Sequence, residues 1–391
     1  MTVLTPIAAA APLLTQWRRT LHTHPELAFE EQATADFIAS TLTALGVDIH
    51  RGLGGTGIVG TIHGALPGPS LGFRADMDAL PMNEENSFDH RSQHAGRAHA
   101  CGHDGHVASL LGLAKYLVEH APATGTVRLI FQPAEETARG ATRMIADGLF
   151  DLFPCDEIYA FHNMPLLARG TVGVRAGAVL TGYAIWQVEI EGVGGHGAAP
   201  HKTNDPLQAA ARLACEIPAI VGRYVDPMQP AVISACAMHA GTSYNIIPSR
   251  AELSGTLRGL SPATQNLLLH HLREACAGIE RTSGCKITCR VVHDCPPCVN
   301  ADAPARLAQQ ACADVLGHAN VIADHAPLPF TDDFAHMLAR CPGAYLFIGQ
   351  DGVMCHHSTY DFDDALLPVA ASIFARIVQR RLTPDGFQVP A

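Results

Sequence analysis

Two hydrophobic patterns alternate along the first 160 residues. Apolar residues recur at helical spacing over 104–120, and a second helical pattern covers 138–147. The short apolar runs that are typical of buried strands cover 57–63, 71–75, 126–131 and 157–161. Strands that alternate with helices predict an α/β domain, with a mixed, largely parallel sheet flanked by helices.

The middle of the chain follows a different order. Its elements alternate as strand, helix, strand, strand, helix and strand over 183–191, 206–221, 231–239, 251–260, 263–281 and 286–292. This order is the ferredoxin-like split pattern. The first pattern returns after residue 299 and ends with a helix over 365–381. We therefore predict a catalytic domain of residues 1–180 and 295–391, into which a smaller α+β domain of residues 181–294 is inserted.

Composition narrows the class of protein. The chain has 48% apolar and 16% charged residues, which is ordinary for a globular protein and excludes a disordered or fibrous one. The net charge of −11, with no basic stripe, argues against nucleic-acid binding, and no apolar run is long enough to cross a membrane. The N-terminus lacks the pattern of a signal peptide, and the 12 Cys show no disulfide-like clustering, so we expect a cytoplasmic protein.

Residues that can bind metal ions gather next to the predicted strands. Ligand sites of α/β sheets lie where strands end, so these residues are expected to meet. They are Asp76 and Asp78 after the second strand, Cys101 and His103 before the helix, Glu135 and Glu136 after the third strand, and His162 at the fourth. A further candidate group, Cys355, His356 and His357, lies near the C-terminus.

The mixture of thiolate, imidazole and carboxylate indicates a borderline or soft metal. Zinc, manganese, nickel and cobalt all fit such ligands better than calcium or magnesium, and the sequence does not choose among the four. One ligand from each of these five places would already exceed what one tetrahedral ion needs, so two divalent ions that share a ligand are expected.

The adjacent Glu135 and Glu136 suggest two carboxylates with different roles. One carboxylate can bind metal, while the other stays free as a base that moves a proton from water to a leaving amine. Each feature also has an ordinary explanation, because Glu pairs usually lie on solvated helix faces and single Cys residues are usually buried apolar side chains. The hypothesis depends on several such sites falling at successive strand ends.

Seven segments of the chain carry a family resemblance. They are RRTLHTHPELAFEE, GFRADMDALPMNEE, HACGHDGHVASLLG, FQPAEETARGA, GGHGAAPH, YNIIP and HHSTYDF. Through them the chain resembles the M20 metallopeptidase family, in its amidohydrolase branch of aminoacylases, hippurate hydrolases and auxin-conjugate hydrolases. The resemblance runs from about residue 18 to residue 381. It implies a catalytic domain with a two-metal site, and an inserted domain that acts as a lid and a dimerisation surface.

The resemblance also implies roles for single residues. The metal ligands would be Cys101, His103, Glu136, His162 and His356, with Cys101 as the bridging ligand. His356 is preferred to His357 because of its spacing from Tyr360. Glu135 would be the general acid and base, Asp78 would orient His103, and His196 would polarise the scissile carbonyl, in dimers from the partner subunit. Asn245 and Arg258 would contact the substrate, although a plain surface charge explains Arg258 equally well.

The function that follows is hydrolysis of N-acyl amino acids to a carboxylate and a free amino acid. A dipeptidase with the same apparatus is the alternative, and a catalytically silent metal-binding protein is an alternative of another class. The resemblance implies a homodimer that acts on a small-molecule substrate. The acyl group, the amino acid and the native metal stay open.

Overall fold

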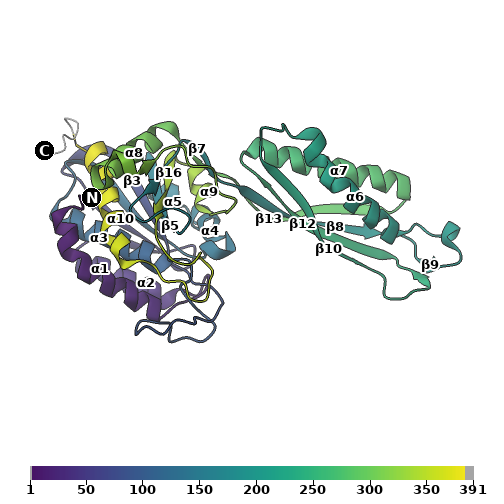
Figure 1. Cartoon of the computed structure of the whole chain (residues 1–391), viewed down its shortest axis with the longest axis horizontal. Coiled ribbons are helices and arrows are strands. Elements are labelled where there is room, and N and C mark those ends of the chain that lie inside the picture. Colours follow the sequence, from purple (N-terminus) through teal and green to yellow (C-terminus); the bar gives the residue numbers. More distant parts are fainter. Residues whose placement is uncertain (1, 384–391) are drawn as a thin grey trace. The chain divides into compact units, whose positions relative to one another are not determined.

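The computed structural model describes residues 2–383, and its described part forms two compact units. The first unit comprises residues 2–179, 299–326 and 332–383, and the second comprises 180–298 and 327–331. Figure 1 labels the helices and many of the strands of both units. The expected α/β architecture with an inserted α+β unit is confirmed, and the segment 327–331 groups with the inserted unit although it follows in the chain.

An eight-stranded sheet forms the centre of the first unit. Its strand order is β1-β2-β4-β3-β5-β16-β6-β15. These strands are β1 (Asp48–Leu53), β2 (Gly57–His63), β3 (Leu66–Asp76), β4 (Thr124–Gln132), β5 (Glu157–Met164), β6 (Val172–Gly173), β15 (Val321–Ile322) and β16 (Gly343–Gly349). The four neighbours β4, β3, β5 and β16 run parallel, whereas β1, β2 and β4 pair in antiparallel fashion. The carboxyl ends of the four parallel strands therefore meet at one edge of the sheet.

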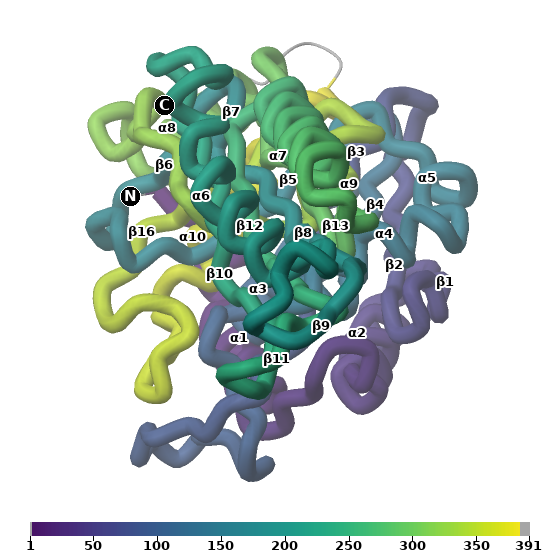
Figure 2. Tube along the Cα trace, turned by 90° about the vertical axis from the view of Figure 1, so that its right-hand side faces the viewer, coloured from purple at the N-terminus to yellow at the C-terminus, as the bar shows by residue number. Residues whose placement is uncertain are grey.

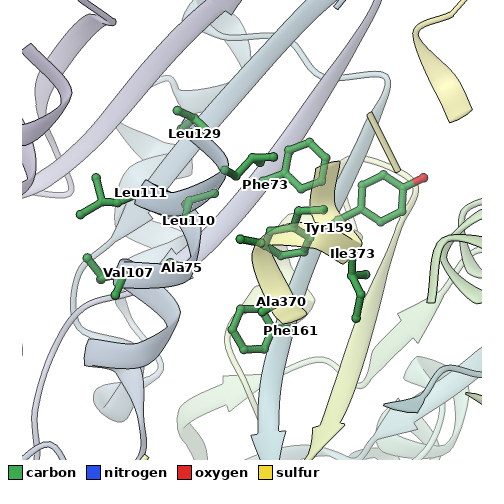
Figure 3. Packing of buried hydrophobic residues seen from close by; sticks show 14 of the residues in the cluster. Phe73, Ala75, Val107, Leu110, Leu111, Leu129, Tyr159, Phe161, Ala370 and Ile373 are labelled. Carbon is green, nitrogen blue, oxygen red and sulfur yellow. The ribbon is translucent and has the colours of Figure 1, made fainter. Parts of the chain in front are cut away.

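Helices cover this sheet and bury its apolar side chains. The unit contains α1 (Thr5–Thr23), α2 (Gln32–Ala44), α3 (His103–Glu119), α4 (Gly140–Ala146), α5 (Leu149–Leu152), α8 (Asp302–Leu316), α9 (Phe334–Leu338) and α10 (Leu367–Arg381). Figure 3 shows Phe73 of β3 and Tyr159 of β5 packed near Ile373 of α10, within the same buried cluster as Leu110 of α3. Because most of β5 and the second half of β3 are buried on both faces, their apolar residues do not alternate with exposed polar ones, as is usual for parallel sheets.

The second unit has the predicted split order of elements. Its strands β8 (Gly182–Glu191), β10 (Ala231–Ala240), β12 (Arg250–Gly259) and β13 (Lys286–Cys295) form an antiparallel sheet in the order β10-β12-β8-β13. Helices α6 (Pro206–Tyr224) and α7 (Pro262–Ser283) run side by side, as Figure 2 shows. Trp186, Leu213 and Leu272 belong to one buried cluster of the sheet and the helices.

Local sequence signals fix the ends of these two helices. Asp205 accepts hydrogen bonds from the backbone amides of Leu207 and Gln208, and Ser261 accepts one from Thr264. Each helix then begins with Pro, which suits a first helical position because its missing N–H has no partner there. Gly284 ends α7 with a φ of 69°, in the left-handed region that glycine adopts without strain.

Two pairs of short strands complete the description. Two short strands of the second unit, β9 (Gly195–His196) and β11 (Ile246–Ile247), pair with each other, as do β7 (Gly177–Leu180) and β14 (Cys298–Asn300). Among residues 2–383, we find no helix with the length and apolar character that a membrane span requires.

Candidate metal centre

The candidate metal ligands of the first unit converge at the carboxyl edge of the parallel strands. Asp78 follows β3, Glu135 and Glu136 follow β4, and His162 lies near the end of β5. His356 lies in the loop after β16, and Cys101 directly precedes α3. Parallel strands place their carboxyl ends side by side, so residues far apart in the sequence come together here.

Cys101 and His103 are held in place by a glycine between them. Gly102 has a φ of 103° and begins α3, so that His103 is the first helical residue. A Cβ at Gly102 would clash with the amide oxygen of Asn163 and lie 2.7 Å from the Tyr360 hydroxyl. Only glycine fits both the backbone conformation and this close approach. The spacing of one glycine thus lets the thiol and the imidazole serve the same site.

Two groups of three ligand atoms share Cys101. One group contains Cys101, His103 and His162, and the other contains Cys101, Glu136 and His356. Within each group the ligand atoms lie within 4.8 Å of one another. The Cys101 sulfur is 3.4 Å from Nε2 of His162, and Nε2 of His356 is 3.5 Å from a carboxylate oxygen of Glu136.

These separations suit metal ligands. Donor atoms bound tetrahedrally to one zinc-like ion lie roughly 3.3–3.7 Å apart, given metal–donor distances of about 2.0–2.3 Å. Nε2 of His103 and Oε1 of Glu136 are 3.8 Å apart, which is too long for a hydrogen bond. Both atoms are buried and have no hydrogen-bond partner within the described residues. Buried polar atoms without partners are destabilising, and cations held at the two groups would satisfy them.

Glu135 lies beside these groups without belonging to either. It begins the short 3-10 turn Glu135–Thr137, and its carboxylate is 3.9 Å from Nε2 of His103. The turn begins after Ala134, which has a φ of 54° and whose amide donates to Glu31 at 2.8 Å. Glu135 shares one group of closely spaced ligand atoms with Asp332 and Asp333, and another with His103 and Glu136. It differs from Glu136 in sharing no group with Cys101 and His356.

Burial and neighbouring carboxylates shift the acid groups of this site. Burial, Asp332 and Glu136 raise the pKa of Glu135 well above its ordinary value. Burial is also the main reason that the pKa of Glu136 rises to about 7. A cation held at the two ligand groups would lower both values again, because positive charge favours the ionised form.

Asp78 contacts two of the candidate ligands, His103 and Glu136. Nδ1 of His103 lies 2.9 Å from the backbone oxygen of Asp78 and 3.2 Å from its carboxylate. The other carboxylate oxygen accepts a hydrogen bond of 3.0 Å from the Glu136 amide. With Nδ1 engaged in this way, Nε2 of His103 faces the site. Burial alone lowers the pKa of His103, but the carboxylates of Asp76 and Asp78 overcome it and raise that pKa well above 6.5.

A buried cluster of charges lies beneath the two glutamates. The guanidinium of Arg74 is fully buried and is 2.7 Å from Asp76, 3.2 Å from Asp332 and 3.2 Å from Asp333. The Tyr345 hydroxyl donates to Asp332 at 2.6 Å. Arg74 and Asp332 are both parts of this cluster, which only the three-dimensional proximity of β3 and the 332–333 segment reveals.

A second polar network connects α3 with the ends of β3 and β5. The sequence did not predict this network either. Nδ1 of His106 is 2.5 Å from Asp76, and its Nε2 is 2.8 Å from the amide oxygen of Asn163. Asn163 in turn donates to the Tyr360 hydroxyl at 2.5 Å. His106 and Asn163 are both fully buried. The only sequence signal was their position next to predicted ligands.

The N-terminal segment also supports the start of α3, through Arg18 and His22 of α1. His22 lies 2.8 Å from Asp104, and the guanidinium of Arg18 lies 3.5 Å from the same carboxylate. Burial alone lowers the pKa of His22, but the Asp104 carboxylate overcomes it and the pKa rises to about 9. Since Asp104 follows His103 in the chain, this pair fixes the first turn of the helix that carries a candidate ligand.

Of the two neighbouring histidines, the structure places His356 in the ligand cluster. His356 has a φ of 67°, an uncommon conformation for a residue other than glycine, and its amide donates to the backbone oxygen of Ala100 at 2.7 Å. His357 is exposed and its Nδ1 is 2.9 Å from the Thr359 hydroxyl. Strained backbone of this kind is frequent at functional sites.

The second unit carries His196, Asn245 and Arg258. The pairing of β9 with β11 sets His196 opposite Ile246, next to Asn245, whose backbone oxygen accepts from Gly197 at 2.9 Å. Arg258 pairs in register with Tyr183, and its guanidinium donates to the Thr331 hydroxyl at 3.1 Å. The roles expected for these three residues stay predictions.

Comparison with known proteins identifies the family. Residues 72–380 match the model of peptidase family M20/M25/M40, and the chain belongs to this family. It is 36% identical to a hippurate hydrolase of Campylobacter jejuni, over 93% of this chain and 95% of that protein. It is 35% identical to an N-acetyl-L-cysteine deacetylase of Bacillus subtilis, over 93% of this chain and 87% of that protein.

A solved structure agrees with this assignment. It is that of a Bacillus subtilis protein described as a dinuclear metal binding peptidase from the M20 family. The match has a TM-score of 0.84 and 31% identity, and covers 96% of this chain and 99% of the other. The family resemblance stated from the sequence motifs is therefore confirmed, together with its amidohydrolase branch.

Proposed function

We propose that this protein is a metal-dependent amidohydrolase that cleaves N-acyl amino acids to a carboxylate and a free amino acid. The observation that carries the proposal is the pair of ligand groups sharing Cys101, with the carboxylate of Glu135 beside them. The relatives support the substrate class, because hippurate and N-acetylcysteine are both amino acids acylated on nitrogen.

The residues present fit two divalent ions. Cys101, His103 and His162 would hold one ion, and Cys101, Glu136 and His356 the other. The donor set of one thiolate, three imidazoles and one carboxylate suits zinc, manganese, nickel or cobalt. When bound, such ions supply a lowered pKa for a coordinated water and positive charge for the developing oxyanion.

The chain's own residues would move the protons. Glu135 takes a proton from the attacking water and then delivers it to the departing nitrogen, as a general base followed by a general acid. Asp78 keeps Nε2 of His103 directed at the site. We assign His196 the donation of a hydrogen bond to the scissile carbonyl oxygen, and Asn245 and Arg258 contacts with the substrate.

The test is a hydrolysis screen of the purified full chain. We expect release of free amino acid from N-benzoyl or N-acetyl amino acids when one of the four metals is supplied, and loss of that release after treatment with a chelator. Dipeptides are measured in parallel. Faster turnover of dipeptides would favour the dipeptidase alternative, and no turnover of any amide with any of the four metals would favour a silent metal-binding protein.

The geometry of the second unit bears on how His196 could act. Along β8, Tyr183 pairs with Arg258 and Glu191 pairs with Arg250. At 3.3 Å per residue these two ends of the sheet are about 26 Å apart. The strand β9 with His196 follows the Glu191 end, since Gly192 hydrogen-bonds Ser249. One small substrate cannot reach both His196 and Arg258 of a single chain, which supports a homodimer with His196 supplied in trans.

Mixing two inactive variants tests this arrangement. We expect Glu135→Gln and His196→Ala each to be impaired when pure. Co-expression in equal amounts should restore about a quarter of wild-type activity, since half of the dimers are mixed and one of their two sites is intact. Activity of the mixed sample no higher than the mean of the two pure variants would show that His196 does not act in trans.

A further inference from the structure

Cys355 is a thiol beside the candidate bridging ligand that neither ligand group uses. Its thiol donates a hydrogen bond to the backbone oxygen of Cys101 at 3.7 Å. The hydrogen bond from the His356 amide to the Ala100 oxygen, at 2.7 Å, joins the two backbone segments next to these cysteines. Both cysteines are free thiols in this structure.

The two cysteines lie close enough for a disulfide to form. A disulfide needs Cα atoms within about 7 Å and Cβ atoms that face each other. The Cys355 sulfur already lies 3.7 Å from the Cys101 backbone, and the hydrogen bond between the neighbouring residues keeps the two segments adjacent. Cys355 is half-buried while Cys101 is buried, so an oxidant arriving from solvent reaches Cys355 first.

We propose that Cys101 and Cys355 form a redox modification site, at which a peroxide converts the two thiols into an intrachain disulfide and thereby withdraws the Cys101 sulfur from both ligand groups. In the first step the peroxide transfers one oxygen to the Cys355 sulfur, giving a sulfenic acid and one water. In the second step the Cys101 sulfur attacks the Cys355 sulfur, and the departing hydroxide takes up the Cys101 proton as a second water.

The overall change is balanced. Two thiols and one hydrogen peroxide give one disulfide and two waters, so the thiols lose two electrons and the peroxide gains them. A dithiol reductant reverses the bond by thiol–disulfide exchange. Because Cys101 belongs to both groups of three donors, its loss leaves each with two. The effect on metal binding and hydrolysis rests on the proposed function, whereas formation of the disulfide does not.

The experiment treats the metal-loaded full chain with hydrogen peroxide. We expect a peptide pair linked through Cys101 and Cys355 in mass spectra taken without reduction, release of metal, and loss of hydrolysis. Dithiothreitol followed by fresh metal should restore both. Cys355→Ser should keep its metal and its basal activity and resist the reversible loss. Cys215→Ser, which removes an exposed thiol of the second unit, should remain as sensitive as the wild type.

Three outcomes would overturn the proposal. One is recovery of Cys101 and Cys355 as separate peptides after peroxide has abolished activity. Another is a linked peptide that forms while metal content stays constant. The third is loss of metal from untreated Cys355→Ser, which would make Cys355 a ligand. If the chain hydrolyses no amide, the linked peptide and the metal content still test the disulfide proposal. Failure of the proposed function can therefore be distinguished from failure of the redox proposal.

Discussion

Replacing Glu135 by glutamine will remove nearly all amide hydrolysis while leaving the metal content of the protein unchanged. A positioned general acid or base contributes about 10²–10⁴-fold to a rate, and we expect kcat to fall by a factor in this range. Glutamine keeps the size and hydrogen bonding of the side chain but cannot accept and return a proton. The measurements are steady-state hydrolysis of the best N-acyl amino acid and metal content by elemental analysis.

Glu136→Gln is the matched control, because it makes the same chemical change one residue away. Glu136 shares a group of ligand atoms with Cys101 and His356, whereas Glu135 does not. We expect Glu136→Gln to lose metal as well as activity, and added metal to restore part of the activity. Glu135→Gln that retains substantial turnover, or that binds less metal than Glu136→Gln, would contradict the assignment of the base.

Strands of the catalytic sheet could be predicted because burial on both faces leaves a plain signal. The expected runs at 57–63 and 126–131 correspond to β2 and to the central part of β4, and the inserted unit has the expected order of elements. The long N-terminal helix α1 was not foreseen. It contains Pro12 within its span and has only a modest apolar face, with Leu14 and Leu21 among its few buried apolar residues.

The candidate metal ligands could be predicted because ligand sites of α/β sheets lie at the ends of strands. All five expected ligands lie in two overlapping groups, although their roles stay proposals. Arg74 was not foreseen because two of its three acidic partners, Asp332 and Asp333, lie far from it in the sequence. The distance between His196 and Arg258 was not foreseen either, because motif positions say nothing about the register of β8 with β12. Sequence patterns therefore do not predict contacts that depend on which distant segments pair in the folded chain.

Removal of the buried guanidinium beneath the glutamates is expected to have the largest effect on stability. Arg74→Met fills a similar volume but leaves Asp76, Asp332 and Asp333 buried without their common cation. Breaking a buried ion pair from one side destabilises a protein by about 3–5 kcal/mol, so we expect a decrease of this order in the free energy of unfolding. Urea denaturation measures it.

The two tryptophans of the chain allow the first unit to be followed by itself. Trp17 lies in α1 of the first unit and Trp186 in β8 of the second, so a Trp186→Phe background leaves fluorescence from the first unit only. In this background Arg143→Met is the matched control, since Arg143 is 65% exposed and pairs with the neighbouring Asp147 at 3.4 Å. We expect no resolvable change there, because exposed ion pairs contribute little.

Arg74→Lys then separates charge from shape. Lysine keeps the positive charge but lacks the planar fork that reaches several carboxylates at once, so its stability should lie between those of the wild type and Arg74→Met. Stability of Arg74→Met equal to that of Arg143→Met would show that the buried carboxylates are compensated without Arg74. In that case the cluster could not be what holds the 332–333 segment beside Glu135.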